Sequence, residues 1–175
     1  MSSLWISEVK YQDPETQTYL GDPTLVRLEG GEILAAHNYF GPGSPQNDRG
    51  QRHLTSIYRS RDNGLSWTDL AHIEGAQWSN LFVHRGLTYL LGTSTEYGNI
   101  VIRRSADGGT NWTQPVDENS GLLLNAGLND EPPNYQSCAS PVLFHEGRLY
   151  RAFEIVGDPA VLSSFRAMVL SAAED

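Results

Sequence analysis

Most side chains that could move a proton or bind a sugar fall in a few irregular stretches of the chain. The segment 37–53, HNYFGPGSPQNDRGQRH, is one of two long stretches of this kind and contains Asp48 beside Arg49. Long irregular loops in compact folds are frequently functional. A carboxylic acid with a raised pKa can protonate a leaving oxygen. We therefore predict that Asp48 is a catalytic acid; the simpler alternative is a solvated loop aspartate.

Other polar and aromatic residues sit near expected strand ends, where they could line a binding site. An aromatic ring accepts the apolar face of a sugar, and a few polar groups fix its orientation. Trp78 is the preferred platform, although packing between sheets would explain it equally well. The predicted substrate-binding residues are Asp22, His37, Arg49, Arg52, Trp78, Tyr97 and Glu154.

Two sequence patterns recur and indicate the elements that must position these residues. The strings SRDNGLSW and SADGGTNW both read S-x-D-x-G-x-x-W and start 45 residues apart, at Ser60 and Ser105. Apolar runs on both sides of a glycine turn recur around Gly31, Gly86 and Gly147. A period of about 40–60 residues with short strands is typical of a propeller or a similar array.

Each repeat divides into short runs of alternating or apolar residues, which predict strands. The expected strands are 24–28, 32–37, 54–60 and 68–73 in unit one, 80–84, 88–93, 99–105 and about 113–116 in unit two, and 142–145, 148–154 and 165–171 in unit three. Residues 4–12 alternate like one more strand. The fold class is therefore all-β, with about three four-stranded blades. The unit bounds are 1–21 for the outer strand and lead-in, then 22–75, 76–135 and 136–175.

The two eight-residue strings resemble the Asp-box, or BNR repeat, of sialidases and related propeller proteins. The resemblance implies a sialidase-like β-propeller in which the box residues are structural and lie on the face opposite the active site. Those residues are Ser60, Asp62, Gly64, Trp67, Ser105, Asp107, Gly109 and Trp112. The third unit reaches its box position as SAAED, where Ala173 replaces the aspartate.

The same resemblance implies parts of a site and shows one departure. Asp48 matches the acid/base residue of the family, on the loop ahead of the first box. Gly21 stands where sialidases carry their first arginine. The remaining arginines, the nucleophilic tyrosine and its glutamate come from later blades in that family. Neutral sugars or another acidic glycan are therefore alternatives to sialic acid.

The number of strands bears on assembly. Sialidase propellers have six blades, which at this repeat length would need roughly 330 residues, and this chain supplies about half. The family's N-terminal strand commonly closes the last blade, so residues 4–12 are expected to complete unit three. Two chains placed head to tail would bury both open sheet faces, so we expect a homodimer that closes a six-bladed ring. A truncated product or fragment is the alternative.

Composition restricts the partners. The 175 residues carry 12 basic and 21 acidic side chains, a formal charge of −9, which argues against nucleic acid and anionic membranes. Cys138 is the only cysteine, and the five histidines form no metal-binding motif, so no metal or cofactor is expected. The start resembles no signal peptide, which favours a cytoplasmic protein, or a secreted one if the start was trimmed.

Two classes of function follow from these observations. The first is a sialidase-like glycoside hydrolase, or a half-propeller derived from one. The second is a carbohydrate-binding or structural propeller module without catalysis. The substitution at Gly21 and the absence of later blades favour the second, whereas the habits of the family favour the first.

Overall fold

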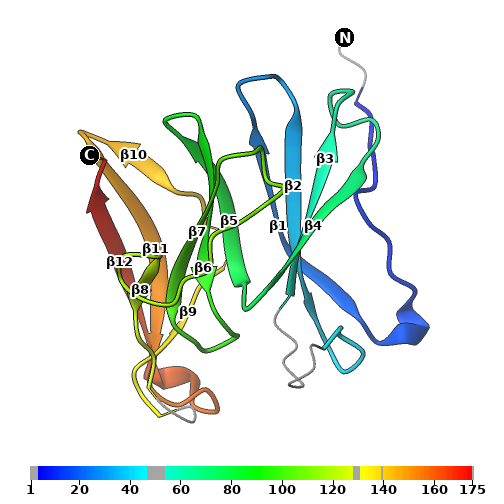
Figure 1. Ribbon diagram of the computed structural model, residues 1–175. Helices are drawn as coiled ribbons and strands as arrows, with labels where there is room; N and C mark the ends of the chain where they lie inside the picture. The colour runs from blue at the N-terminus through cyan, green and yellow to red at the C-terminus, as the bar shows by residue number, and fades with distance from the viewer. Residues whose placement is uncertain (1–3, 47–53, 128–130, 139, 175) are drawn as a thin grey trace.

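The computed structural model describes residues 4–46, 54–127, 131–138 and 140–174, and nearly all regular structure in them is β-strand (Figure 1). The first sheet contains, in spatial order, β1 (Tyr19–Arg27), β2 (Ile33–Phe40), β3 (Leu54–Ser60) and β4 (Thr68–Glu74). The second contains β5 (Gln77–His84), β6 (Leu87–Thr93), β7 (Ile100–Ser105) and β8 (Leu122–Leu124). The third contains β9 (Asn134–Gln136), β10 (Leu143–His145), β11 (Arg148–Val156) and β12 (Phe165–Ala173). The predicted all-β, blade-like architecture is confirmed.

All strand pairs are antiparallel, and the inner strand of the third sheet is split. β9 and β10 pair with opposite ends of β11, whose other edge pairs with β12. Short 3₁₀ turns precede the first sheet, as η1 (Pro14–Thr16), and β12, as η3 (Leu162–Ser164). No helix in the described ranges has the length and apolar character needed to cross a bilayer.

Tight turns between the first two strands of each unit follow from glycine. Gly31, Gly86 and Gly147 have φ values of 88°, 76° and 72°, in the left-handed region that a side chain disfavours. Each glycine lies in the turn between two apolar runs, so its position fixes the register of the two strands that the runs form.

The turn between β3 and β4 is organised by its own serine and aspartate. The Ser60 hydroxyl donates to Asp62 Oδ1 at 2.8 Å and accepts from the Gly64 amide at 2.7 Å. Asp62 also accepts from the amide and the hydroxyl of Ser66. These hydrogen bonds stabilise the carboxylate and lower the pKa of Asp62 to about 2.

The turn after β7 repeats this arrangement. Ser105 donates to Asp107 at 2.9 Å and accepts from the Gly109 amide at 2.8 Å. The amide of Asn111 bonds Asp107 Oδ1 at 2.9 Å, and the pKa of Asp107 is again lowered to about 2. Two turns distant in sequence thus share one hydrogen-bond pattern.

The third unit differs from the sequence-based alignment of its box. Ser60 and Ser105 lie opposite the second residue after their turn glycines, and the residue in that register in the third sheet is Ala172, opposite Leu149. The alignment that put Ala173 at the aspartate position is therefore wrong by one residue, because pairing with β11 sets the register. Glu174 occupies the aspartate position.

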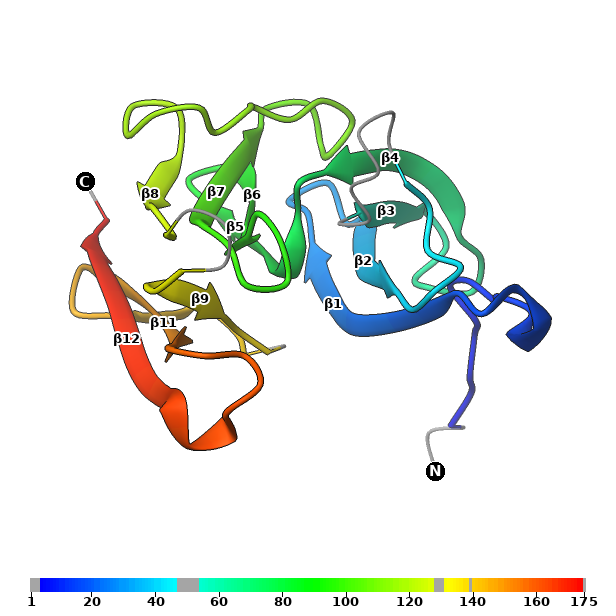
Figure 2. The ribbon, with the colours of Figure 1, turned by 90° about the horizontal axis from the view of Figure 1, so that it is seen from below.

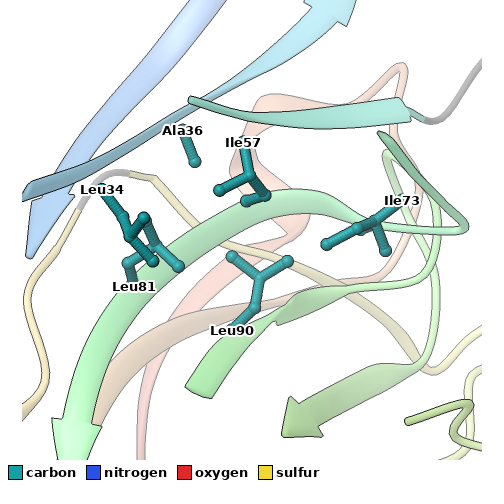
Figure 3. Packing of buried hydrophobic residues seen from close by; sticks show 7 residues of the cluster. Leu34, Ala36, Ile57, Ile73, Leu81 and Leu90 are labelled. Atoms are coloured by element: carbon teal, nitrogen blue, oxygen red, sulfur yellow. The ribbon is translucent and has the colours of Figure 1, made fainter. Parts of the chain in front are cut away.

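The first and second sheets pack face to face through one apolar cluster. Its buried members are Leu34, Ala36, Ile57, Ile73, Ala76, Leu81 and Leu90 (Figure 3). A second cluster joins the second and third sheets, with Phe82, Leu91, Ile100, Tyr135 and Phe153 buried. The three sheets therefore form consecutive layers, each bound to the next by side chains that alternate along the strands.

The tryptophans of the two turns have different surroundings. Trp112 packs against the cluster between the first two sheets. The indole of Trp67 instead donates to the Ser7 hydroxyl at 3.1 Å and belongs to neither described cluster. The sequence pattern treats the two residues alike, whereas the structure separates them.

We expect Trp112→Ala to lower the free energy of unfolding by about 2 kcal/mol, because a partly buried aromatic side chain loses its contacts with the apolar cluster. Trp67→Ala should cost less by at least about 1 kcal/mol, because Trp67 packs in neither apolar cluster. Urea denaturation followed by far-ultraviolet circular dichroism measures both. An equal or larger loss for Trp67→Ala would contradict the packing described here.

The N-terminal segment is not the outer strand of the third sheet. Residues 4–12 carry no strand, and the Ser7 hydroxyl bonds the Gly64 carbonyl while it accepts from Trp67. Figure 1 shows this segment beside the first sheet, with the second sheet between it and the third. The predicted strand is therefore wrong within the chain, since these contacts hold the segment at the opposite end of the layers.

The last strand of the second sheet is also displaced. It was expected near 113–116 and instead is β8 at Leu122–Leu124. Pro115 has no N–H to donate to a ladder, and Asp117 then accepts from the amides of Asn119 and Ser120 in a tight turn. The chain therefore loops outward before it pairs with β7.

Candidate functional site

The three inner strands are irregular at equivalent positions near the face where β1 and β5 begin, which is the face seen in Figure 2. The register slips within β1 around Asp22 and within β5 around Trp78. Both residues have left-handed φ values, 49° and 48°. Ser137, directly after β9, holds the matching place where the third inner strand breaks off. Bulges and left-handed non-glycine residues re-aim side chains and concentrate at functional sites.

Arg151 of β11 links these three positions, which together with Arg151 we call the hub. The residue is 2% exposed, and its Nη2 donates to the Trp78 carbonyl at 2.6 Å and to Ser137 Oγ at 3.2 Å. It also attracts the Asp22 carboxylate electrostatically. Burial lowers the pKa of Arg151 to about 10, so the guanidinium remains charged at neutral pH. One buried cation therefore connects all three sheets.

The Asp22 carboxyl is half-buried and oriented by neighbours on the next two strands. Asn38 Nδ2 donates to Asp22 Oδ2 at 3.2 Å, and the Thr55 hydroxyl holds Asn38 by donating to its Oδ1 at 2.7 Å. Burial raises the pKa of Asp22, while the Asn38 hydrogen bond and the Arg151 charge partly oppose the rise. A carboxyl group with a raised pKa keeps its proton to a higher pH, as a general acid must.

Aromatic side chains stand beside the hub on the second and third sheets. The indole of Trp78 donates to the Glu96 carbonyl at 2.9 Å. Tyr97 meets Phe165 edge to face, with ring centroids 6.5 Å apart. Burial raises the pKa of Tyr97, and the nearby carboxylates of Glu96 and Glu154 add to the effect. The arrangement places aromatic faces next to carboxylates, which suits a polyhydroxylated ligand.

The structure brings together four of the sequence-predicted residues: Asp22, Trp78, Tyr97 and Glu154 are associated with the hub or its aromatic border. His37 lies elsewhere. It is 6% exposed, its ring is stacked on that of Tyr58, and its Nε2 is 3.3 Å from the Tyr58 hydroxyl. Its side chain is therefore occupied within the first sheet.

Three predicted site residues cannot be placed, and the sequence-based prediction missed the cation of the hub. Asp48, Arg49 and Arg52 lie outside the described residues, so the role of Asp48 stays a prediction. Arg151 was missed, although a charged residue between Leu149 and Phe153 on the apolar face of a strand is a usable signal. Among the described ranges, no group of three or more His, Cys, Asp or Glu side chains could hold a metal ion.

Known proteins resemble this chain in structure but not in sequence. No model of a known protein family matches it, and no curated protein sequence is significantly similar. An alpha-L-arabinanase of Penicillium chrysogenum, complexed with arabinobiose, superposes with a TM-score of 0.60 at 19% identity, over 88% of this chain and 46% of the enzyme. The chain has a propeller glycosidase-like fold.

Two further solved structures support this assignment of the fold. A family 117 glycoside hydrolase of Zobellia galactanivorans gives a TM-score of 0.60 at 12% identity, over 95% of this chain and 55% of that one. A Hadza microbial sialidase gives 0.54 at 12% identity, over 87% and 35%. The chain thus spans about half the length, or less, of the propellers it resembles.

Proposed function

We propose that this chain carries part of the carbohydrate site of a glycoside-cleaving β-propeller, with Asp22 as a proton-donating carboxyl. The observation that carries the proposal is the hub itself. Three inner strands from three sheets place a half-buried carboxyl with a raised pKa beside a buried guanidinium and an aromatic border. The arabinanase, the family 117 glycoside hydrolase and the sialidase described above share the fold, which supports the same assignment.

Most glycoside hydrolases use two carboxyl groups, one to protonate the leaving oxygen and one to act as base or nucleophile. Within the described residues Asp22 would supply the first, and the sequence-based prediction that Asp48 is the catalytic acid is the alternative. The polar hub would orient sugar hydroxyls, and the faces of Trp78 and Tyr97 would receive the apolar side of the ring.

We propose that the substrate carries a neutral sugar and not sialic acid. The Cβ of any larger residue at position 21 would lie 3.0 Å from the Phe40 ring, so an arginine there requires that ring to move. The arabinanase neighbour was solved with arabinobiose, a neutral disaccharide. We therefore place arabinosides ahead of sialosides as substrates, and we assign the two serine–aspartate turns to the Asp-box type.

A carbohydrate-binding module without catalysis is the second candidate. It is favoured by one observation: Asp22 is the one carboxyl group among the residues that form the hub. The assay that separates the two uses 4-nitrophenyl α-L-arabinofuranoside and a methyl arabinoside as substrates, with calorimetry of arabinobiose binding. Turnover supports the enzyme, saturable binding without turnover supports the module, and neither result would contradict both.

The proposed site is completed by a second copy of the chain. Leu34 and Ala36, three and five residues after their turn glycine, pack against the second sheet. The equivalent residues of the third sheet are Tyr150 and Ala152, on a face where Val169 is 65% exposed. Among the described residues no further sheet covers that face.

The first sheet offers the complementary surface. Its outer face holds an apolar recess of about 290 Å³ that Leu25 and Ala35 help to line, and Leu25 is 63% exposed. Two copies arranged head to tail would bury both faces. Light scattering should therefore give twice the mass of one chain at micromolar concentration, and a well-folded monomer would contradict the ring.

A further inference from the structure

A second recess lies away from the hub, where the turn after β7 reaches the edge of β4. Figure 2 shows these two segments side by side at the outer margin of the first two sheets. The recess has a volume of about 550 Å³, which is within the range of small-molecule sites. Its walls are residues 71–74 of β4 on one side and Thr110, Asn111, Trp112 and Gln114 on the other.

A buried arginine fixes the two walls relative to each other. Arg103 is 4% exposed, and its Nη1 donates to Gln114 Oε1 at 2.7 Å and to the Thr113 carbonyl at 3.2 Å. Its Nη2 donates to the carbonyls of Glu74 and Gly75, each at 3.0 Å. The recess is therefore built on a rigid base rather than formed by loose surface side chains.

The same contacts leave specific hydrogen-bonding groups for a ligand. Because the Gln114 carbonyl accepts from Arg103, its amide group is held as a donor. Asn111 is the converse case, since its Nδ2 donates to Asp107 Oδ2 at 2.6 Å and its carbonyl oxygen is an acceptor. One donor and one acceptor thus face the same recess.

The opposite wall adds backbone groups, and the turn adds an aromatic surface. β4 is an edge strand of the first sheet, and an edge carries N–H and C=O groups that do not pair within the sheet. Trp112 lines the recess while it also packs on the core, and its Nε1 is spent on the Gly109 carbonyl at 2.8 Å. The ring is therefore held in place as a platform.

We propose that this recess binds a neutral sugar ring of an oligosaccharide, independently of the hub. Among the described lining residues there is no lysine or arginine, and His72 already contacts Asp69 Oδ1 through Nε2 at 3.4 Å and the Ser56 hydroxyl through Nδ1 at 2.7 Å. The described lining therefore offers an acidic sugar no uncommitted cation. The Arg103 charge lies beneath the surface and is committed to four acceptors. Alternating hydroxyls with one apolar face match the platform, the donor and the acceptor.

The test follows the indole N–H signals of the ¹⁵N-labelled chain by NMR while xylobiose, cellobiose, lactose or glucuronic acid is added. Trp112→Phe identifies the Trp112 signal. We expect at least one neutral disaccharide to shift that signal in a saturable way at millimolar concentration, and glucuronic acid to leave it unchanged.

Gln114→Glu is the informative variant, because it keeps an acceptor for Arg103 and replaces the amide donor by a negatively charged acceptor oxygen. This variant should lower the affinity for the disaccharide at least about fivefold, which is the effect of one lost hydrogen bond. Gln17→Glu makes the same change on an exposed loop residue and should have no effect. Asp22→Asn should also leave the shift unchanged, which separates this site from the hub.

A Trp112 signal that none of the neutral disaccharides moves would overturn the proposal. An equal shift with glucuronic acid would also overturn it, as would unchanged affinity in a well-folded Gln114→Glu chain.

Discussion

Asp22→Asn is expected to reduce kcat for a methyl arabinoside at least about 100-fold, the usual contribution of a positioned general acid. Asparagine keeps an oxygen that can accept from Asn38, so the geometry of the hub should survive. It cannot donate a proton to the leaving oxygen. The nitrophenyl arabinoside, whose leaving group scarcely needs a proton, should lose far less activity.

Two controls make this result interpretable. Asp13→Asn changes the same side chain at the exposed cap of η1, where asparagine caps as well as aspartate, and should keep full activity. Near-ultraviolet circular dichroism of Asp22→Asn should match that of the parent. An equal loss on both substrates would argue against proton donation by Asp22 and for a positioning role.

Gly92→Ala is expected to lower the free energy of unfolding by about 3 kcal/mol, the upper end of ordinary overpacking. A Cβ at this position would lie 2.4 Å from Ser79 Oγ, 2.5 Å from the Gln77 carbonyl oxygen and 2.7 Å from Ser79 Cα. Two of these three atoms belong to the bulged backbone of β5, so the strand itself must move. The same shift would displace Trp78, whose carbonyl accepts from Arg151.

Gly30→Ala is the matched change. A Cβ there meets nothing within 4 Å, and its φ lies outside the left-handed region, so stability should change by less than about 0.5 kcal/mol. Urea denaturation measures both variants, and the Trp78 indole signal reports on the hub. Equal stability of the two variants would mean that β5 is not bulged against Gly92.

The two predictions concern one structural device. The left-handed conformation of Asp22 and Trp78 persists only because surrounding contacts determine it. On the β5 side, the bulged backbone packs closely against Gly92, which has no side chain, and the Trp78 carbonyl accepts from the buried guanidinium of Arg151. Loss of either should alter the hub before it alters the rest of the fold.

Features that depend on a few neighbouring residues could be predicted from the sequence. The glycine turns and the serine–aspartate turns are closed by hydrogen bonds between residues at most four positions apart. Their signals are therefore complete within an eight-residue string. Strand alternation is equally local, and it located the strands of all three sheets except β8, which it placed too early, and β9, which it missed.

Features that depend on the meeting of distant strands could not be predicted in this way. The Arg151 contact to Trp78 spans 73 residues, and the Trp67 contact to Ser7 spans 60. Alternation marks Arg151 only as a strand residue and residues 4–12 only as a strand-like run. Which sheet such a segment joins depends on competing long-range contacts.

The candidate site also combines features that the sequence predicts with features that depend on contacts between distant strands. The sequence predicted Asp22, Trp78, Tyr97 and Glu154 at strand ends or in loops on one face, whereas Asp22, Trp78 and Glu154 lie within β1, β5 and β11. Contacts between distant strands, by contrast, turn His37 into the first sheet, bring Phe165 against Tyr97, and bury Asp22 near Arg151 so that its pKa rises. Burial and charge at a point are sums over neighbours from several strands, and no single segment of the sequence contains those sums.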